Sequence, residues 1–338
     1  MLFGLQGAGA GATRGEAARG RELEGYDFVG SADTQAVAPD VYCVLTEYAL
    51  ATKRIQIGPF VTNASTRMPV VTASAIATID ALSHGRAFMA IGTGKSATAN
   101  AGLPPASPED LARAVTVIAS AFRPVRGARE DVEWPKGLSI DETVVALPSW
   151  VTRRVPIYVS ASGPKALRIA AEMGDGVILS PGDVPWDTAS EYVAQLRSWR
   201  DSGPRAGDPF LIVQNLRCFA TDSIEEGRAA IRGTISAHAR YTRLVDMPEE
   251  LRDAQRRYRA EYRWEHVGGI SGNPVNLELM ESLGLADYMF ERYAIIGDDL
   301  AIARAVRRLE DAGIDGVAGV PPSAMATYRE VMAGRLAP

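Results

Sequence analysis

The sequence has few of the side chains that carry metal chemistry, nucleophilic chemistry or disulfide bonds. Its 338 residues include only two cysteines and three histidines. Cys43 and Cys218 lie on different predicted elements and show no ligand spacing, so neither a disulfide nor a zinc site is indicated. A reduced, cytoplasmic setting is expected for such a chain. This scarcity favours chemistry that is supplied by an organic cofactor.

Long apolar runs and an excess of positive charge are also absent. No stretch approaches the roughly 18 uninterrupted apolar residues that would cross a bilayer. Residues 1–12 lack the basic segment of a signal peptide. With 36 basic and 41 acidic residues the formal net charge is −5, which does not favour nucleic acid or an anionic membrane as a partner. A content of 46% apolar and 23% charged residues is typical of a globular enzyme.

What the sequence does contain is an alternation of β-rich runs and helical stretches. Strands are predicted at residues 1–6, 26–32, 54–61, 86–91, 156–161, 176–180, 209–220 and 316–320. Helices are predicted at residues 14–24, 40–52, 69–82, 108–122, 164–173, 186–200 and 298–312. Connections of this length join parallel strands. Eight such strands predict the α/β class and a (β/α)₈ TIM-like barrel, with sites at the carboxyl ends of the strands.

Two stretches interrupt this alternation. Residues from about 124 to 154 are rich in proline and glycine, and we predict an excursion with short strands there. Residues from about 223 to 290 are too long for one crossover, and we predict a mostly helical insertion. The whole chain, 1–338, is interpreted as one domain. The alternative is an open doubly wound sheet, but residues 7–11 do not have the G-x-G-x-x-G spacing that usually follows its first strand.

Three segments at predicted strand ends are candidates for ligand binding. Residues 58–63 include a proline inside a strand, which indicates either a bulge against a planar ligand or an ordinary strand exit. Residues 92–96, with two glycines and Lys95, either approach an anionic ligand or form a flexible turn, and they lack the spacing of a P-loop. Residues 160–164 lead into a helix, whose start either binds a phosphate, with help from Ser180, or is simply capped.

Few titratable residues lie near these strand ends. Asp33 ends the second strand and is well placed at the active-site face. His84 follows a helix on the opposite side of the barrel, so we interpret it as structural. His238 and His266 lie in the insertion, and His266 is a candidate for the substrate pocket, with a surface position as the alternative.

Taken together and in this order, these segments resemble the luciferase-like superfamily of flavin- and deazaflavin-dependent oxidoreductases. The resemblance is greatest to the branch that contains methylenetetrahydromethanopterin reductase. It is most specific in residues 54–96, from Ile-Gly-Pro-Phe-Val-Thr-Asn to Ile-Gly-Thr-Gly. Further matches lie at residues 155–164 with 174–176, and at 293–297 with 313–315, whereas 223–290 match weakly.

The resemblance implies a TIM-like barrel that binds reduced FMN or the deazaflavin coenzyme F-420 without covalent attachment. It implies a cis peptide between Phe60 and Val61 that forms a bulge behind the ring system of the coenzyme. It also implies that Arg292 contacts an anionic substrate, and that the protein is a homodimer. The residues expected to bind the coenzyme are Phe60, Val61, Asn63, Gly92, Thr93, Gly94, Ala161, Ser162, Gly163 and Ser180.

Two positions depart from the pattern of the superfamily. Many relatives have Asp-His at the end of strand two, where this chain has Asp33 and Thr34. Lys95 stands where the sugar-phosphate dehydrogenases of the superfamily have an acidic Glu. Hydride transfer by F-420 normally needs an acid or base. The candidates for this catalytic role are Asp33, Thr34, Lys95 and His266.

Three functions are therefore compatible with the sequence. A monooxygenase that uses O₂ and reduced FMN from a separate flavin reductase tolerates the loss of acid and base, since its protein groups only orient a small organic substrate and exclude water. An F-420-dependent reductase or dehydrogenase is favoured by the branch resemblance. A coenzyme-free binding protein is opposed by the intact segments 92–94 and 162–164. The sequence leans slightly towards the monooxygenase.

Overall fold

A computed structural model describes residues 1–7, 9, 11, 13–35, 38–122, 151, 153–179, 188–263 and 274–336. Three sequence predictions fall outside the described residues. They are most of the excursion at about 124–154, the phosphate contact Ser180, and the candidate catalytic residue His266.

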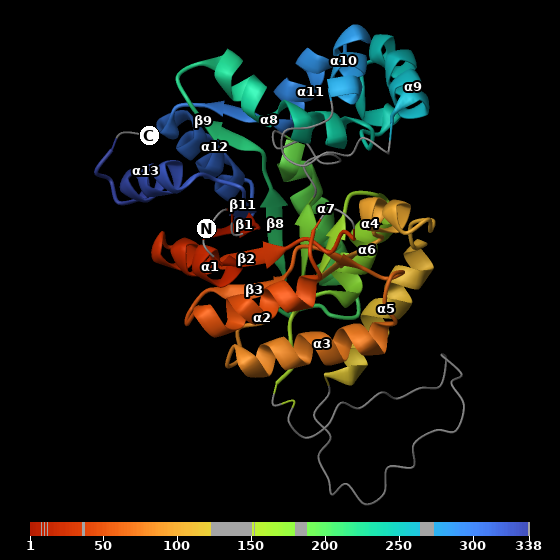
Figure 1. Cartoon of the computed structure of the whole chain (residues 1–338), viewed down its shortest axis with the longest axis vertical. Coiled ribbons are helices and arrows are strands. Elements are labelled where there is room, and N and C mark those ends of the chain that lie inside the picture. The colour runs from red at the N-terminus through yellow and green to blue at the C-terminus, as the bar shows by residue number, and fades with distance from the viewer. Residues whose placement is uncertain are drawn as a thin grey trace, which may run out of the picture.

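Parallel strands form the centre of the molecule (Figure 1). Their order is β3-β2-β1-β11-β8-β7-β6-β5-β4. The bounds are Leu2–Gln6 for β1, Phe28–Ser31 for β2, Gln56–Pro59 for β3, Thr62–Asn63 for β4, Met89–Gly92 for β5, Ile157–Ala161 for β6, Gly176–Leu179 for β7, Leu211–Asn215 for β8 and Gly316–Ala318 for β11.

β3 and β4 stand at the two ends of this strand order, and they are the two halves of one interrupted strand. β3 pairs with β2, whereas β4, which starts three residues later along the same segment, pairs with β5. A bridge between Ile57 and Ala87 joins β3 to the segment that leads into β5. The sheet therefore closes on itself with eight strand positions, and the prediction of a TIM-like (β/α)₈ barrel is confirmed.

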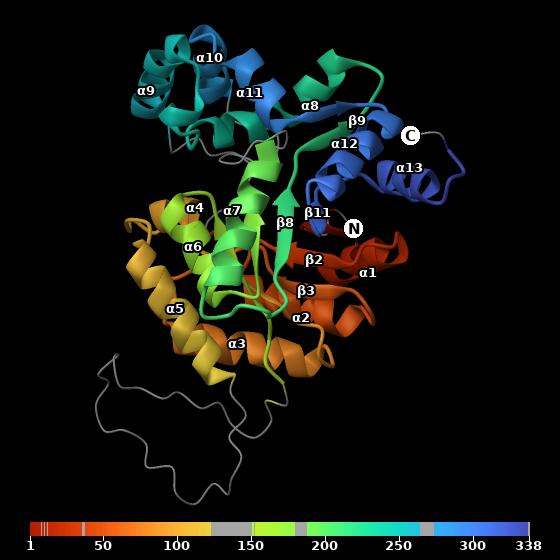
Figure 2. The ribbon, with the colours of Figure 1, turned by 180° about the vertical axis from the view of Figure 1, so that it is seen from behind.

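Helices surround this barrel and alternate with its strands (Figures 1 and 2). Two of them begin with a capping box, in which Thr13 and Glu16 start α1 and Ser107 and Asp110 start α5. Two of these helices, α4 and α13, were not predicted from the sequence. The helices are α1 Arg14–Leu23, α2 Val41–Ala51, α3 Pro69–Leu82, α4 Lys95–Asn100, α5 Pro108–Ala121, α6 Pro164–Met173, α7 Ala189–Ser202, α12 Asp299–Asp311 and α13 Pro322–Met332.

The segment 209–220, predicted as a single strand, is divided between two sheets. β8 ends at Asn215, and β9 (Cys218–Ala220) pairs in parallel with β10 (Ile295–Gly297) outside the barrel. Where the chain leaves the barrel, the Leu216 N–H donates to the Ala318 carbonyl. The single-strand prediction was wrong because both parts are β-forming, and only the partner changes.

The described part of the insertion between β9 and β10 is mostly helical. It contains α8 (Ile224–Ala239), α9 (Arg252–Glu261), α10 (Pro274–Ser282) and α11 (Ala286–Tyr293). A hydrophobic cluster separate from the barrel core holds these helices together, and Tyr258 is fully buried in it. Figure 2 shows the arrowhead of β8 pointing towards this layer, so the insertion lies over the carboxyl ends of the strands.

The opposite end of the barrel is held by aspartates that accept backbone N–H groups from neighbouring strands. Asp27 accepts from Phe3 at 2.8 Å, and Asp315 accepts from Ile212 at 2.7 Å. Asp175 accepts from Ile157 at 2.7 Å and also pairs with arginines. The Gly-Asp-Gly motif at 174–176 and the Gly-Ile-Asp motif at 313–315, which carry part of the family resemblance, therefore contribute to stability and not to the site.

Two smaller findings complete the fold. His84 is exposed after α3, with a φ of 56°. Among the described residues, no helix has the length and apolar character needed to cross a membrane.

Candidate coenzyme site

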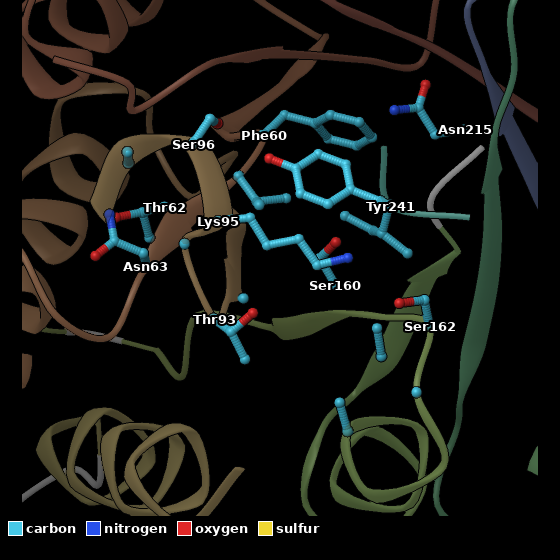
Figure 3. A pocket seen from close by; sticks show the side chains of 18 of the residues that line it. Phe60, Thr62, Asn63, Thr93, Lys95, Ser96, Ser160, Ser162, Asn215 and Tyr241 are labelled. Atoms are coloured by element: carbon cyan, nitrogen blue, oxygen red, sulfur yellow. The ribbon is translucent and has the colours of Figure 1, made fainter. Parts of the chain in front are cut away.

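A cavity of about 710 Å³ opens at the carboxyl ends of the barrel strands. Its size falls within the range of small-molecule sites, which is about 300–1,000 Å³. In Figure 3, Phe60, Lys95 and Tyr241 lie together near the middle of the view. The expected residues that line this cavity are Asp33, Thr34, Phe60, Val61, Asn63, Gly92, Thr93, Gly94, Lys95, Ala161, Ser162 and Gly163.

The interruption between β3 and β4 forms one wall of the cavity. The peptide bond between Phe60 and Val61 is cis, as the resemblance implied. The Phe60 N–H donates to the Ser31 carbonyl at 2.7 Å, and the Phe60 carbonyl accepts from Gln6 Nε2 at 2.7 Å. The Phe60 ring is stacked with Phe28 in the barrel interior. The bulge is therefore held from both sides, and it is not an ordinary strand exit.

Asp33 is a buried carboxyl group in this wall, only 3% exposed. Thr62 Oγ1 donates to its Oδ2 at 2.5 Å, and Gln35 Nε2 donates to its Oδ1 at 2.9 Å. Burial raises the pKa of Asp33, while the Thr62 hydrogen bond and the charge of Arg67 oppose this effect without cancelling it. Asp33 therefore keeps a proton to a higher pH than an ordinary aspartate does.

The Gly-Thr-Gly segment begins α4 and is not a flexible turn. Gly94 is the N-cap of α4 with a φ of 80°, and a Cβ there would lie 2.4 Å from Asn63 Cβ. The Asn63 side chain accepts from the N–H groups of Ser65 and Thr66 and donates to Thr66 Oγ1. Asn63 therefore shapes the loop behind the cavity, although it also lines the cavity.

The start of α6 has the properties of a phosphate site. Gly163 is its N-cap and makes no side-chain cap hydrogen bond, and Pro164 follows at the first position. Gly163 has ordinary extended angles, φ −85° and ψ 152°, and a Cβ there would meet no atom within 4 Å. Neither the backbone nor the packing requires glycine here, so open space faces the free N–H groups of the helix.

One side of the cavity was not predicted from the sequence, and it is formed by Arg217, His238, Tyr241 and Arg243. His238 Nδ1 lies 2.7 Å from the Thr234 carbonyl, which can only accept, so Nδ1 carries the proton. Burial, and then the charge of Arg217, lower the pKa of His238 to about 3. His238 is therefore neutral. No local motif marks these residues, because their directions depend on how the insertion packs.

Arg217 is a cation of this wall whose guanidinium is held by hydrogen bonds. Its Nη1 donates to Asn215 Oδ1 at 3.1 Å and to the Leu216 carbonyl at 3.0 Å, and Nη2 lies 3.4 Å from His238 Nε2. Its Nε is buried and has no hydrogen-bond partner among the described residues. Burial lowers the pKa of Arg217 to about 10, so it is charged at neutral pH.

Arg292, the expected substrate contact, is not among the described residues that line the cavity. It lies on α11, where its guanidinium is 5.6 Å from the Tyr288 ring centroid and 5.7 Å from that of Tyr293. Its Nε donates to the Tyr293 hydroxyl at 3.2 Å. Arg292 therefore packs against tyrosines of its own helix.

A closed parallel barrel with a cis-peptide bulge, a buried acid and an open helix start around one cavity is an arrangement that can hold a phosphate-bearing organic coenzyme. The family model described as "Luciferase-like monooxygenase" matches residues 5–316. The chain therefore belongs to this family of enzymes.

The proteins that are similar to the chain include two curated relatives and one solved structure. A 5,10-methylenetetrahydromethanopterin reductase of Archaeoglobus fulgidus is 37% identical over 169 residues, which are 47% of this chain and 46% of that protein. The reductase of the same name from Methanopyrus kandleri is 28% identical over 293 residues, 81% of this chain and 79% of that protein. The chain thus matches about half the length of the first of these relatives.

The solved structure is an F-420-dependent secondary alcohol dehydrogenase in complex with an F-420-acetone adduct. It has a TM-score of 0.71 and 16% identity, and the match covers 99% of both chains. At this identity, the likeness supports the fold alone.

Proposed function

We propose that this protein is an F-420-dependent oxidoreductase that transfers a hydride between the deazaflavin and a small organic substrate. The similar proteins named as reductases support this proposal. The observation that carries it is Asp33, a buried carboxyl group with a raised pKa in the wall of the cavity. The main objection to hydride transfer was the absence of an acid, and Asp33 answers that objection.

The residues of the chain have distinct roles in this proposal. The N–H groups at the start of α6 bind the coenzyme phosphate, and the bulge at residues 60–61 supports the ring system. When bound, F-420 supplies or accepts the hydride. Asp33 donates a proton to the substrate during reduction and accepts it in the reverse direction, while Thr62 and Gln35 orient its carboxyl group. The insertion covers the cavity and excludes water.

A monooxygenase that uses reduced FMN and a partner flavin reductase is the second candidate. The family description favours it, and so does Thr34 in place of the histidine that many relatives have. The start of α6 would bind the FMN phosphate equally well. In this case Asp33 would only position the substrate, and its proton would not be transferred.

Equilibrium binding separates these candidates. F-420 and FMN, each oxidised and reduced, are titrated into the purified protein and followed by fluorescence quenching. Selective binding of F-420 supports the first candidate, and tight binding of reduced FMN alone supports the second. The Asp33→Asn variant then tests the proton role, with Asp201→Asn on the outside of α7 as the matched control. Unchanged hydride transfer in Asp33→Asn overturns the assigned role of Asp33.

A further inference from the structure

The described residues that line the cavity carry an excess of positive charge. Among the described charged side chains that line the cavity, Asp33 is acidic, whereas Lys95, Lys165, Arg217 and Arg243 are basic, and of these Lys165 is paired with Glu109 at 3.5 Å. This balance is opposite to the net charge of −5 of the whole chain. A local excess of cations around a ligand cavity favours an anionic ligand.

We propose that the substrate carries an oxyanion, a carboxylate or a phosphate, and that Arg217 binds this group. The inference rests on the proposed function and adds the class of substrate to it. Arg217 is the best placed of the basic residues because its guanidinium is already held in position. Its hydrogen bonds to Asn215 and Leu216 go to neutral oxygens, so they orient the group without compensating its charge.

Three observations indicate that the positive charge of Arg217 is available to bind an anionic ligand. No ion pair joins Arg217 to a carboxylate within the described part of the chain. Its Nε is buried without a hydrogen-bond partner among the same residues. The other charged groups that influence the neighbouring His238 are Arg240 and Lys95, which are also cations. A buried, uncompensated cation is costly unless an anion binds to it.

The other basic residues of the wall have contacts that Arg217 does not have. Lys95 Nζ lies 4.5 Å from the centroid of the Tyr241 ring, which Figure 3 shows beside it. Arg243 Nη2 donates to the Tyr192 hydroxyl at 3.1 Å. These side chains border the same cavity, so they add to the positive potential around Arg217 while making contacts of their own.

The position of Arg217 separates it from the coenzyme phosphate. The phosphate site lies at the end of β6, whereas Arg217 follows β8, and β7 lies between these two strands. Neighbouring strands are about 4.8 Å apart, so the two sites lie roughly 10 Å from each other across the barrel mouth. One phosphate cannot contact both, and the cavity therefore offers separate places for the coenzyme phosphate and for an anionic group of the substrate.

Calorimetric titration with inorganic phosphate, and in parallel with acetate, tests this proposal on the coenzyme-saturated protein at constant ionic strength. We expect saturable binding that Arg217→Gln weakens at least about tenfold, because a hydrogen-bonded charge is lost. Coenzyme affinity should stay unchanged. Arg217→Lys should recover part of the anion affinity, and Arg256→Gln, on the exposed face of α9, is the matched control. Stronger binding of phosphate or of acetate identifies which oxyanion the site prefers.

The possible failures are distinguishable. If the wild-type protein binds neither anion, the inference is wrong, whatever the coenzyme does. If Arg217→Gln weakens the coenzyme and the anion equally while its melting temperature matches the control, Arg217 belongs to the coenzyme site and the inference is wrong. If no coenzyme binds, the proposed function fails. The titration is then made on Gly163→Asp protein, whose α6 start is blocked, and loss of phosphate binding on adding Arg217→Gln still supports the anion site.

Discussion

Replacing Gly163 by aspartate should abolish coenzyme binding and leave the fold intact. Gly163 has extended backbone angles that any residue adopts, and its Cβ would point into open space. Aspartate is also a better N-cap than glycine by a few tenths of a kcal/mol. The variant should therefore melt at the same temperature as the wild-type protein or slightly above it. This separates a loss of binding from a loss of structure.

The expected loss of binding follows from electrostatics. The new carboxylate would lie beside the phosphate site, and two unit charges about 4 Å apart interact by roughly 4 kcal/mol at an effective dielectric constant of about 20. The same carboxylate would also accept the N–H groups at the start of α6 that the phosphate needs. A cost of roughly 4 kcal/mol corresponds to a Kd about a thousandfold higher.

The assay is fluorescence quenching by the coenzyme that the wild-type protein binds, together with thermal melts. Gly20→Asp is the matched control, since Gly20 lies on α1 and a Cβ there also meets no atom within 4 Å. Near-normal coenzyme affinity in a folded Gly163→Asp protein would refute the assignment of the phosphate to the start of α6. A large fall in melting temperature would refute the argument that glycine is not required there.

Four further predictions follow from the described residues. Asp33→Asn should slow hydride transfer at least ~100-fold without lowering stability at pH 7, because burial raises the pKa of Asp33 and penalises its ionised form. Wild-type reduction should fall as pH rises through this raised pKa, and a flat pH–rate profile would contradict the acid role. Asp175→Asn should lose about 1.5–3 kcal/mol of unfolding free energy at pH 7. Burial raises the pKa of Asp175, but hydrogen bonds from Arg154 and a backbone N–H lower it overall. The stability that Asp175 contributes should therefore vanish as pH falls through the lowered pKa. Urea melts in which Asp175→Asn loses as much unfolding free energy in acid as at pH 7 would contradict this. Gly58→Ala should cost about 1–3 kcal/mol or more, since its Cβ would lie 2.2 Å from a backbone carbonyl oxygen, and an unchanged denaturation midpoint would disprove this. The homodimer stays a prediction, and light scattering should give a mass of twice 36.2 kDa. Val71→Glu on the exposed face of α3 should reduce this mass to that of a monomer. A monomeric wild-type protein would exclude the homodimer.

Much of the barrel and of the coenzyme wall could be predicted from the sequence. Strand and helix periods are local properties, so the eight strand positions and most of their crossovers follow from residue patterns. The carboxyl ends of parallel strands meet at one end of a barrel, which is why segments as distant as 58–63 and 160–164 line one cavity. The order of these motifs also identified the family, which the family model confirms.

Only the tertiary structure decided the wall that faces the coenzyme residues. Arg217 and His238 meet because β9 leaves the barrel to pair with β10, and because α8 packs into a hydrophobic cluster of its own. Arg292 contacts Tyr288 and Tyr293 and is not among the described residues that line the cavity. A helix pattern shows which face is apolar, but the direction of each polar side chain depends on how that helix is placed. The sequence by itself therefore determined the barrel and the side of the cavity proposed to bind the coenzyme, and the packing of the insertion determined the side proposed to bind the substrate.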